Sequence, residues 1–318
     1  MKTVDVAVVG AGPAGIAAAR AAAESGAQTV LLDENARIGG QLRWRISLTL
    51  EHTGGFDIPA GPGPDISGEL EHQLAAVDNL TIETGTVAWG LFAGNVLGIS
   101  TDSAADELQA RSIVLATGST DIVSPFPGWT LPGVMTARAA QIFMHVHRVL
   151  PGRAWVILGD GEEAAELAAD LEQSGVDVIA RCADPDRIRA SGTNRLAHVE
   201  IGDAVYEADS LAVALGRQPD AELAFQANAA GAFVRDLGGY TVNRDDSGQT
   251  SEEGVYVAGD AAGIATLDEL IAEGRVVGLA AAGAPAEEFA TARQVLAAAG
   301  SQRRINAISQ LRLQPVSS

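Results

Sequence analysis

The sequence predicts an α/β protein that contains two βαβ units of the same design. Two glycine-rich turns, at residues 10–15 and 159–164, each follow a short apolar run and lead into a segment that suits a helix. A second apolar run follows each helical segment, and runs of four or five apolar residues are typical of buried parallel strands. The turns lie 149 residues apart (159 − 10), which indicates an internal duplication.

The first turn, Gly10-Ala11-Gly12-Pro13-Ala14-Gly15, has the G-x-G-x-x-G pattern of dinucleotide sites. Gly10 permits the tight turn, Gly12 lets a pyrophosphate approach the backbone, and Gly15 lets helix and strand pack closely. The N–H groups at the helix start would hold the phosphate charge. Glu34, 24 positions after Gly10 (34 − 10), can accept hydrogen bonds from a ribose. The combination predicts dinucleotide binding, by FAD or by NAD; the alternative is a tight turn in an unrelated α/β protein.

Three further segments place small or polar residues at expected strand ends and loops. The loop 39–42 has two glycines that allow close backbone approach, and Gln41 in it offers an amide. A strand at 111–115 ends in the small residues 116–118. A later strand ends in Gly-Asp, and its Asp260 can bond a polyol hydroxyl. A helix is expected from about residue 267.

The second glycine turn differs from the first in charge. Glu162 and Glu163 put two negative charges where a pyrophosphate would lie, and Arg181 stands where a ribose-binding acid is expected. Arg181 could hold a 2′-phosphate, so two interpretations stay open for this unit. It binds NAD(P), or it retains the fold without the ligand.

Composition excludes several classes of function. Acids outnumber bases 41 to 21, for a net charge of −20, which disfavours nucleic acid and anionic membranes as partners. The single Cys182 excludes a redox dithiol, a disulfide framework and an iron–sulfur cluster held by this chain alone. No apolar run is long enough to span a membrane, and Asp5 interrupts the first one, so a cytoplasmic location is expected.

No metal site is predicted. His145 and His147 lie on an expected helix at 136–149, where positions i and i+2 face different ways. After Glu288 the chain has no acids and four arginines, which are Arg293, Arg303, Arg304 and Arg312. They suit a surface helix with a frayed end or, alternatively, a docking tail for an acidic partner.

The remaining segments are assigned from their turn residues and apolar periods. We expect a loop at 43–66, a short helix at 68–77, and a meander of strands at 81–85, 86–92 and 95–101. Residues 119–133 contain three prolines and two glycines, so they form an extended connector at a domain boundary.

The chain resembles the FAD-dependent pyridine nucleotide-disulfide oxidoreductase superfamily in its two-domain, thioredoxin-reductase-like form. The motifs that match are 10–15 with Glu34, 39–42, 116–118 and 254–260. The resemblance implies two Rossmann-like domains of three layers (ββα/βαβ), the second inserted in the first. Residues 1–121 and 240–318 would form the FAD domain, and 122–239 an NAD(P)-binding-like domain. It assigns FAD contacts to Gly10, Gly12, Pro13, Ala14, Gly15, Asp33, Glu34, Asn35, Gly40, Gln41, Leu42, Val87, Ala116, Thr117, Gly118, Gly259 and Asp260.

Longer stretches, 116–143, 149–153, 214–223 and 238–263, are similar to FAD-containing α subunits of heteromeric amine dehydrogenases. These include opine, proline and hydroxyproline dehydrogenases and hydrogen cyanide synthase. The resemblance implies an electron-handling subunit that works through flavin N5, beside a second flavoprotein subunit that oxidises an amine or imino acid. The cysteine-rich C-terminal segment of many relatives is not in this sequence. No catalytic side chain is assigned. The alternatives are a standalone NAD(P)H-dependent reductase that serves ferredoxin, quinone or a small acceptor, and a non-catalytic structural flavoprotein.

Overall fold

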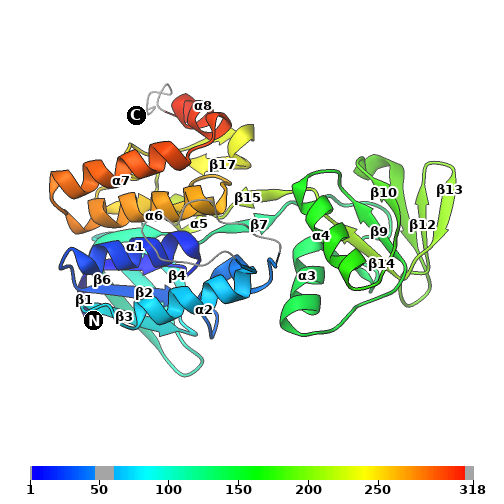
Figure 1. Cartoon of the computed structure of the whole chain (residues 1–318), viewed down its shortest axis with the longest axis horizontal. Coiled ribbons are helices and arrows are strands. Elements are labelled where there is room, and N and C mark those ends of the chain that lie inside the picture. The colour runs from blue at the N-terminus through cyan, green and yellow to red at the C-terminus, as the bar shows by residue number, and fades with distance from the viewer. Residues whose placement is uncertain (1, 47–60, 312–318) are drawn as a thin grey trace. The chain divides into compact units, whose positions relative to one another are not determined.

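The computed structural model describes residues 2–46 and 61–311, which divide into two compact units (Figure 1). The first unit comprises Met1–Ser119 and Gln218–Ser318, and the second comprises Thr120–Arg217. The first segment of the first unit ends at Ser119, two residues before the expected boundary at 121. The second unit ends at Arg217 instead of the expected residue 239, because helix α5 (Glu222–Gln226) and the residues around it pack in the core of the first unit.

The first unit contains a mainly parallel sheet with helices. Its elements before the second unit are β1 (Lys2–Val9), α1 (Pro13–Glu24), β2 (Thr29–Asp33), η1 (Gly40–Arg43), α2 (Gly63–Leu74), β3 (Leu80–Thr84), β4 (Val87–Phe92), β5 (Val96–Ser100) and β6 (Ala105–Leu115). Those after it are α5, β16 (Gly231–Val234), η4 (Arg235–Leu237), β17 (Gly239–Val242), β18 (Val255–Val257), η5 (Gly259–Ala262), α6 (Leu267–Ala282), α7 (Ala286–Ala299) and α8 (Gln302–Leu311). Where the chain crosses between the units, β7 (Ser119–Asp121) pairs with β15 (Arg217–Pro219).

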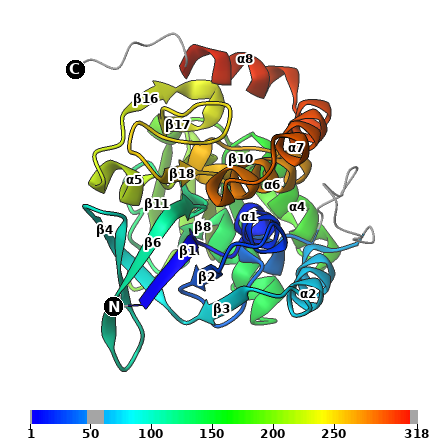
Figure 2. The same ribbon diagram turned by 90° about the vertical axis from the view of Figure 1, so that its left-hand side faces the viewer.

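This unit has three layers because successive side chains along its strands point to opposite faces of the sheet, and both faces are apolar. The strands β3-β2-β1-β6-β18 run parallel, and β5 and β4 continue from β6 as an antiparallel meander. Val6 and Val8 face the cluster built with α1, α2 and α6, whereas Ala7 and Val9 face the meander and α5. Figure 2 shows α1, α2 and α6 on one side of β1, β2 and β3.

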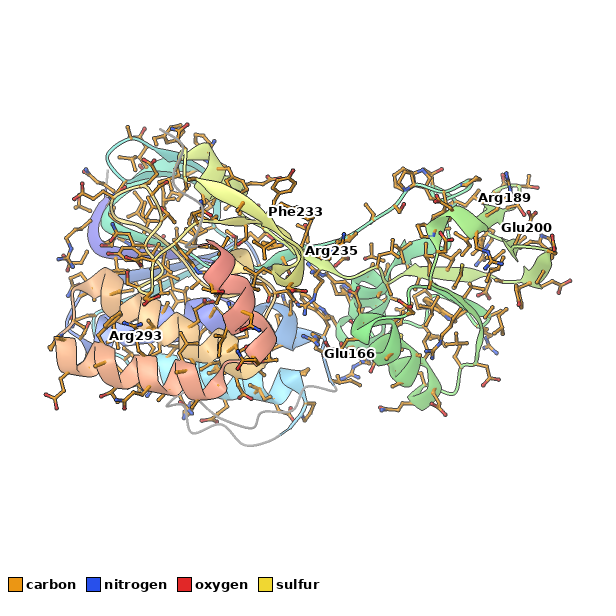
Figure 3. The ribbon with its side chains drawn as sticks, turned by 90° about the horizontal axis from the view of Figure 1, so that it is seen from above. Glu166, Arg189, Glu200, Phe233, Arg235 and Arg293 are labelled. Carbon is orange, nitrogen blue, oxygen red and sulfur yellow. The ribbon has the colours of Figure 1, made fainter. Side chains whose placement is uncertain are left out.

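The second unit repeats this design in a smaller form. Its elements are β8 (Val134–Thr136), α3 (Ala137–Gln141), a π-helical turn η2 (Ile142–Val146), β9 (Trp155–Leu158), α4 (Glu162–Gln173), β10 (Val178–Cys182), η3 (Pro185–Arg187), β11 (Ile188–Ser191), β12 (His198–Ile201), β13 (Ala204–Glu207) and β14 (Ser210–Val213). The parallel order is β10-β9-β14-β8, and β11-β12-β13 form a meander, on which Arg189 and Glu200 are cross-strand neighbours (Figure 3). The predicted α/β fold with two Rossmann-like units, the second inserted in the first, is confirmed.

Three local predictions differ from the structure. Helix α2 begins at Gly63, five residues before the predicted start, because Pro64 fits the first turn of a helix rather than ending a loop. Strand β3 pairs with β2 at the parallel edge and is not part of the meander. The helix predicted at 136–149 ends at Val146 with the π-helical turn. Most of the predicted loop at 43–66 lies outside the described residues.

Helices α1 and α6 pack backbone against backbone through two glycines. A Cβ atom on Gly274 would lie 2.1 Å from the carbonyl oxygen of Ala14, and one on Gly278 would lie 2.2 Å from that of Ala18. No real Cβ contact is that short, so both positions accept only glycine at this helix separation. The sequence spacing i, i+4 places both glycines on the face of α6 that meets α1.

We expect Gly278→Ala to lower the free energy of unfolding by about 1–3 kcal/mol, because the added methyl group forces α6 away from α1. Chemical denaturation of the full chain measures the change. Gly68→Ala is the matched control: Gly68 lies inside α2, and a Cβ there meets nothing within 4 Å. It should leave stability unchanged or raise it by about 0.5–1 kcal/mol. Equal effects of the two substitutions would contradict the packing argument.

Candidate dinucleotide-binding site

The first glycine turn joins β1 to α1 beside the end of β6. Gly10 has φ +98°, and a Cβ on it would lie 2.3 Å from the carbonyl oxygen of Ala116. A Cβ on Gly15 would lie 1.8 Å from the carbonyl oxygen of Gly10. A Cβ on Gly12 would meet nothing within 4 Å. Two glycines therefore serve close packing, and the third faces open space that a pyrophosphate could enter.

The start of helix α1 has backbone N–H groups that could bind an anion. Gly12 is the N-cap without a side-chain cap, Pro13 occupies the first turn, and that turn holds no acid. No described residue accepts a hydrogen bond from the N–H groups of Ala14 and Gly15. These donors and the positive end of the helix dipole favour a bound phosphate.

Two acids at the end of β2 have different roles. Asp33 is buried, and its Oδ2 accepts from the Ala11 N–H at 2.7 Å while its Oδ1 accepts from the Asn35 N–H at 2.8 Å. Asp33 thus holds the turn, and the exposed Glu34 carboxylate is left for a ribose. The Thr86 N–H donates to the Asp33 carbonyl oxygen at 2.9 Å, which places the start of β4, with its half-exposed Val87, beside this acid pair.

A polar network joins three distant segments near the glycine turn. Gln41 Nε2 donates to Ser119 Oγ at 2.9 Å and lies 3.4 Å from Asp260 Oδ2. Ser119 Oγ donates to the same Asp260 oxygen at 3.0 Å, and both residues are buried. Sequence reasoning missed Ser119; the only signal for it was its position directly after residues 116–118.

Three other predicted site residues are held by contacts within the first unit. Gly40 lies against Gly12, since a Cβ on it would be 2.9 Å from the Gly12 Cα. The Thr117 hydroxyl donates to the Asp220 carbonyl oxygen, so it is already engaged. The Leu42 side chain is buried in the helix-side core and can contribute to a site only through its backbone.

The structure therefore gathers the predicted segments at one edge of the first sheet. Residues 10–15, 33–35, 116–118 and 259–260 follow the carboxyl ends of β1, β2, β6 and β18, which is the edge where open α/β sheets bind ligands. Their individual contacts with a cofactor stay predictions.

The second glycine turn has the same backbone but a different charge. A Cβ on Gly159 would lie 2.0 Å from the Ala214 carbonyl oxygen, and Gly161 faces open space like Gly12. The first turn of α4, however, contains Glu162 and Glu163. Glu163 Oε2 accepts from the Gly216 N–H at 3.2 Å. Its carboxylate thus takes a backbone donor at the end of β14 that a ligand could otherwise use.

Burial, and then the nearby Asp121 carboxylate, raise the pKa of Glu163 to about 7. Arg217, the Gly216 N–H and Arg138 act in the opposite direction. Arg138 Nε also lies 2.9 Å from Asp121 Oδ1, so acids and bases are interleaved around this helix start.

The two histidines of the predicted helix lie in different surroundings. His145 Nε2 lies 3.2 Å from the buried Asp170, whereas His147 is exposed. Residues 2–46 and 61–311 contain no group of three or more His, Cys, Asp or Glu that could hold a metal ion. Over the same ranges, every helix is too short or too polar to cross a bilayer.

Comparison with known proteins places these features in one family. The model of the pyridine nucleotide-disulphide oxidoreductase family matches residues 4–187 and 161–282. The A subunit of the opine oxidase of Agrobacterium tumefaciens (strain Ach5) is 30% identical to this chain over an alignment of 334 positions. The alignment covers 87% of this chain and 65% of that protein. The alpha subunit of the sarcosine oxidase of Rhizobium meliloti (strain 1021) is 32% identical over 195 residues, 55% of this chain and 18% of that protein.

A solved structure gives the same result at the level of the fold. The crystal structure of L-proline dehydrogenase from P. horikoshii superposes with a TM-score of 0.80 at 27% identity, covering 93% of this chain and 59% of that one. The chain spans less than two thirds of the length of each of these three relatives.

We expect the stability of the chain to fall as pH rises from about 5 to 7, in part because of Glu163. Its folded pKa of about 7 lies above the ordinary value of 4.5. The stabilisation is therefore complete below the ordinary pKa and is lost as pH rises through the folded one. Glu163→Gln should reduce the loss of unfolding free energy between pH 5 and 7 by roughly 1–3 kcal/mol, after allowance for solvent screening. Denaturation at several pH values measures it, with exposed Glu162→Gln as control; an unchanged slope in Glu163→Gln would refute the assignment.

Proposed function

Because the chain belongs to the pyridine nucleotide-disulphide oxidoreductase family and is an FAD-dependent oxidoreductase, we propose that it is the α-type, electron-handling subunit of a heteromeric amine or imino-acid dehydrogenase. One contrast carries this proposal. Helix α1 begins with free N–H donors and no acid, whereas α4 begins with two glutamates, one of which takes the Gly216 N–H. A dinucleotide is favoured in the first unit and opposed in the second.

The first unit would hold FAD along the edge described above. The N–H groups of α1 would bind the pyrophosphate, and Glu34 would bind the adenosine ribose. The network of Gln41 and Asp260 would contact the ribityl chain of the flavin. When bound, the flavin supplies hydride acceptance at N5. The residues of this chain bind, orient and shield it, and we assign no acid–base side chain.

The substrate and the partner are part of the proposal. Two of the relatives are named as subunits of larger oxidases, one of opine oxidase and one of sarcosine oxidase. We infer a second flavoprotein subunit that oxidises the amine or imino acid and passes electrons to this one. The cytoplasmic location predicted from the sequence stays a prediction.

A second candidate function is a standalone NAD(P)H-dependent reductase. The observation in its favour is that the second unit keeps the complete βαβ design and the open space at Gly161. Glu162 argues against it by repulsion of a pyrophosphate at the start of α4, and Glu163 argues against it by occupying the Gly216 N–H that a ligand could use.

The position of FAD is tested by Gly12→Val. Gly12 has ordinary φ of −76° and open space beside it, so valine folds without strain but fills the phosphate position. We expect the affinity for FAD to fall by more than about tenfold, while the melting temperature of the apoprotein is unchanged. Gly161→Val, the equivalent change in the second unit, should leave FAD affinity unchanged. Titration of apoprotein with FAD, followed by flavin fluorescence, measures both. Equal FAD affinity of wild type and Gly12→Val would place the cofactor elsewhere.

The subunit role is tested by anaerobic titration of the FAD-loaded chain with NADH and NADPH. We expect the yellow flavin band to stay oxidised with both nucleotides, because the second helix start repels them. The band should bleach once the co-purified partner subunit is supplied together with an amine or imino-acid substrate. Stoichiometric bleaching by NADH or NADPH alone would instead establish the standalone reductase.

A further inference from the structure

Three buried charges meet beneath the turn that carries Asp260. Glu273 on α6 is 6% exposed and Arg304 on α8 is 5% exposed. Arg304 Nη2 lies 2.9 Å from Glu273 Oε2, and Arg244 Nη2 lies 3.3 Å from Glu273 Oε1. Burial opposes ionisation of this carboxyl, but Arg304 and Arg244 hold the pKa of Glu273 below its usual value. The cluster is therefore ionised, and its members depend on one another.

Glu273 connects this cluster to the candidate cofactor site. The same Oε2 atom that receives Arg304 accepts a hydrogen bond from the Gly259 N–H at 2.8 Å. Gly259 has φ +74°, and a Cβ on it would lie 2.6 Å from the Cβ of Ala14, in the first turn of α1. The carboxylate thus fixes the residue that packs on the proposed phosphate site.

The two arginines also hold the far end of the same turn. Arg244 Nη1 donates to the Ala262 carbonyl oxygen at 2.7 Å, and Arg304 Nη2 lies 3.5 Å from the Gly263 carbonyl oxygen. Both ends of η5, which carries Asp260 between them, are therefore tied to one ion cluster. Helix α8 contributes to it through Arg304.

We propose that Arg304 is a positioning residue for FAD, which acts through Glu273 to hold the Gly259–Ala262 turn against helix α1. The inference rests on the FAD site proposed above. Without Arg304, the one cation left beside the buried Glu273 among the described residues would be Arg244, at the longer distance of 3.3 Å. Glu273 would then lose charge or turn away from the Gly259 N–H. A protonated or displaced carboxyl is a weaker acceptor for that N–H, and Asp260 would lose its fixed place.

This inference changes the interpretation of the arginine-rich C-terminal region. Arg304 faces inward and is not available to dock an acidic partner. Arg293, on α7 in Figure 3, pairs with Asp246 at 2.7 Å and is about half exposed. The side chains of Arg303 and Arg312 lie outside the described residues.

The test compares Arg304→Met and Arg304→Lys with the surface control Arg293→Met in the full chain. We expect Arg304→Met to weaken FAD binding about tenfold, the equivalent of one charge-assisted hydrogen bond, and to change the visible circular dichroism of the bound flavin. Arg304→Lys should recover part of the affinity, and Arg293→Met should stay within about twofold of wild type. Apoprotein melting temperatures separate folding from binding, and Arg304→Lys keeps the test valid if Arg304→Met does not fold.

Glu273→Gln provides the double-variant cycle. If Arg304 acts through Glu273, Arg304→Met should cost much less FAD affinity in the Glu273→Gln background than alone. Wild-type FAD affinity and flavin dichroism in Arg304→Met, or full additivity with Glu273→Gln, would overturn the inference. Its failure is distinct from failure of the site, because Gly12→Val reports on the site independently of α8.

Discussion

The close approach of backbones around Ala14 is the constraint on which the first unit depends. A Cβ on Gly274 of α6 would lie 2.1 Å from the Ala14 carbonyl oxygen, and one on Gly259, the first residue of η5, would lie 2.6 Å from the Ala14 Cβ. Neither position therefore accepts a side chain. The contact fixes α6 against the first turn of α1, and α6 in turn brings Glu273 to the Gly259 N–H. A candidate site assembled from segments far apart in sequence keeps its shape because the helices carrying them cannot separate without opening this contact.

The two units show how one fold supports different chemistry. Each has a parallel sheet, a meander and a helix that starts at a glycine turn without a side-chain cap. They differ in whether charge at that helix start complements or opposes a phosphate. The second unit satisfies the Gly216 N–H donor with its own Glu163. Function thus follows the local electrostatics, and the shared fold does not decide it.

The sequence predicted what local patterns determine. Short apolar runs, glycine turns and helix starts predicted the α/β design and its duplication, and the strand-end residues 10–15, 33–35, 116–118 and 259–260 do meet at one edge. It did not predict relations set by tertiary contacts. Ser119 joins Gln41 and Asp260 across the fold, Asp33 serves its own turn, and Arg304 is buried although its neighbours suggested a surface helix. The second compact unit ends at Arg217 and not at residue 239 for the same reason, since α5 packs on a sheet far from it in sequence.

The discontinuous first unit has a consequence for how the protein is made. Strand β18 pairs with β6 in a register that joins Val255 to Ile113, residues 142 apart (255 − 113), and α6 closes on α1 later still. On the ribosome, the inserted unit is synthesised completely before these strands and helices exist. The inserted unit can fold first, while the N-terminal βαβ segment waits with its sheet edge and the face of α1 uncovered. The proposed cofactor site, which includes Asp260, can therefore be completed only after β18 and α6 have been synthesised.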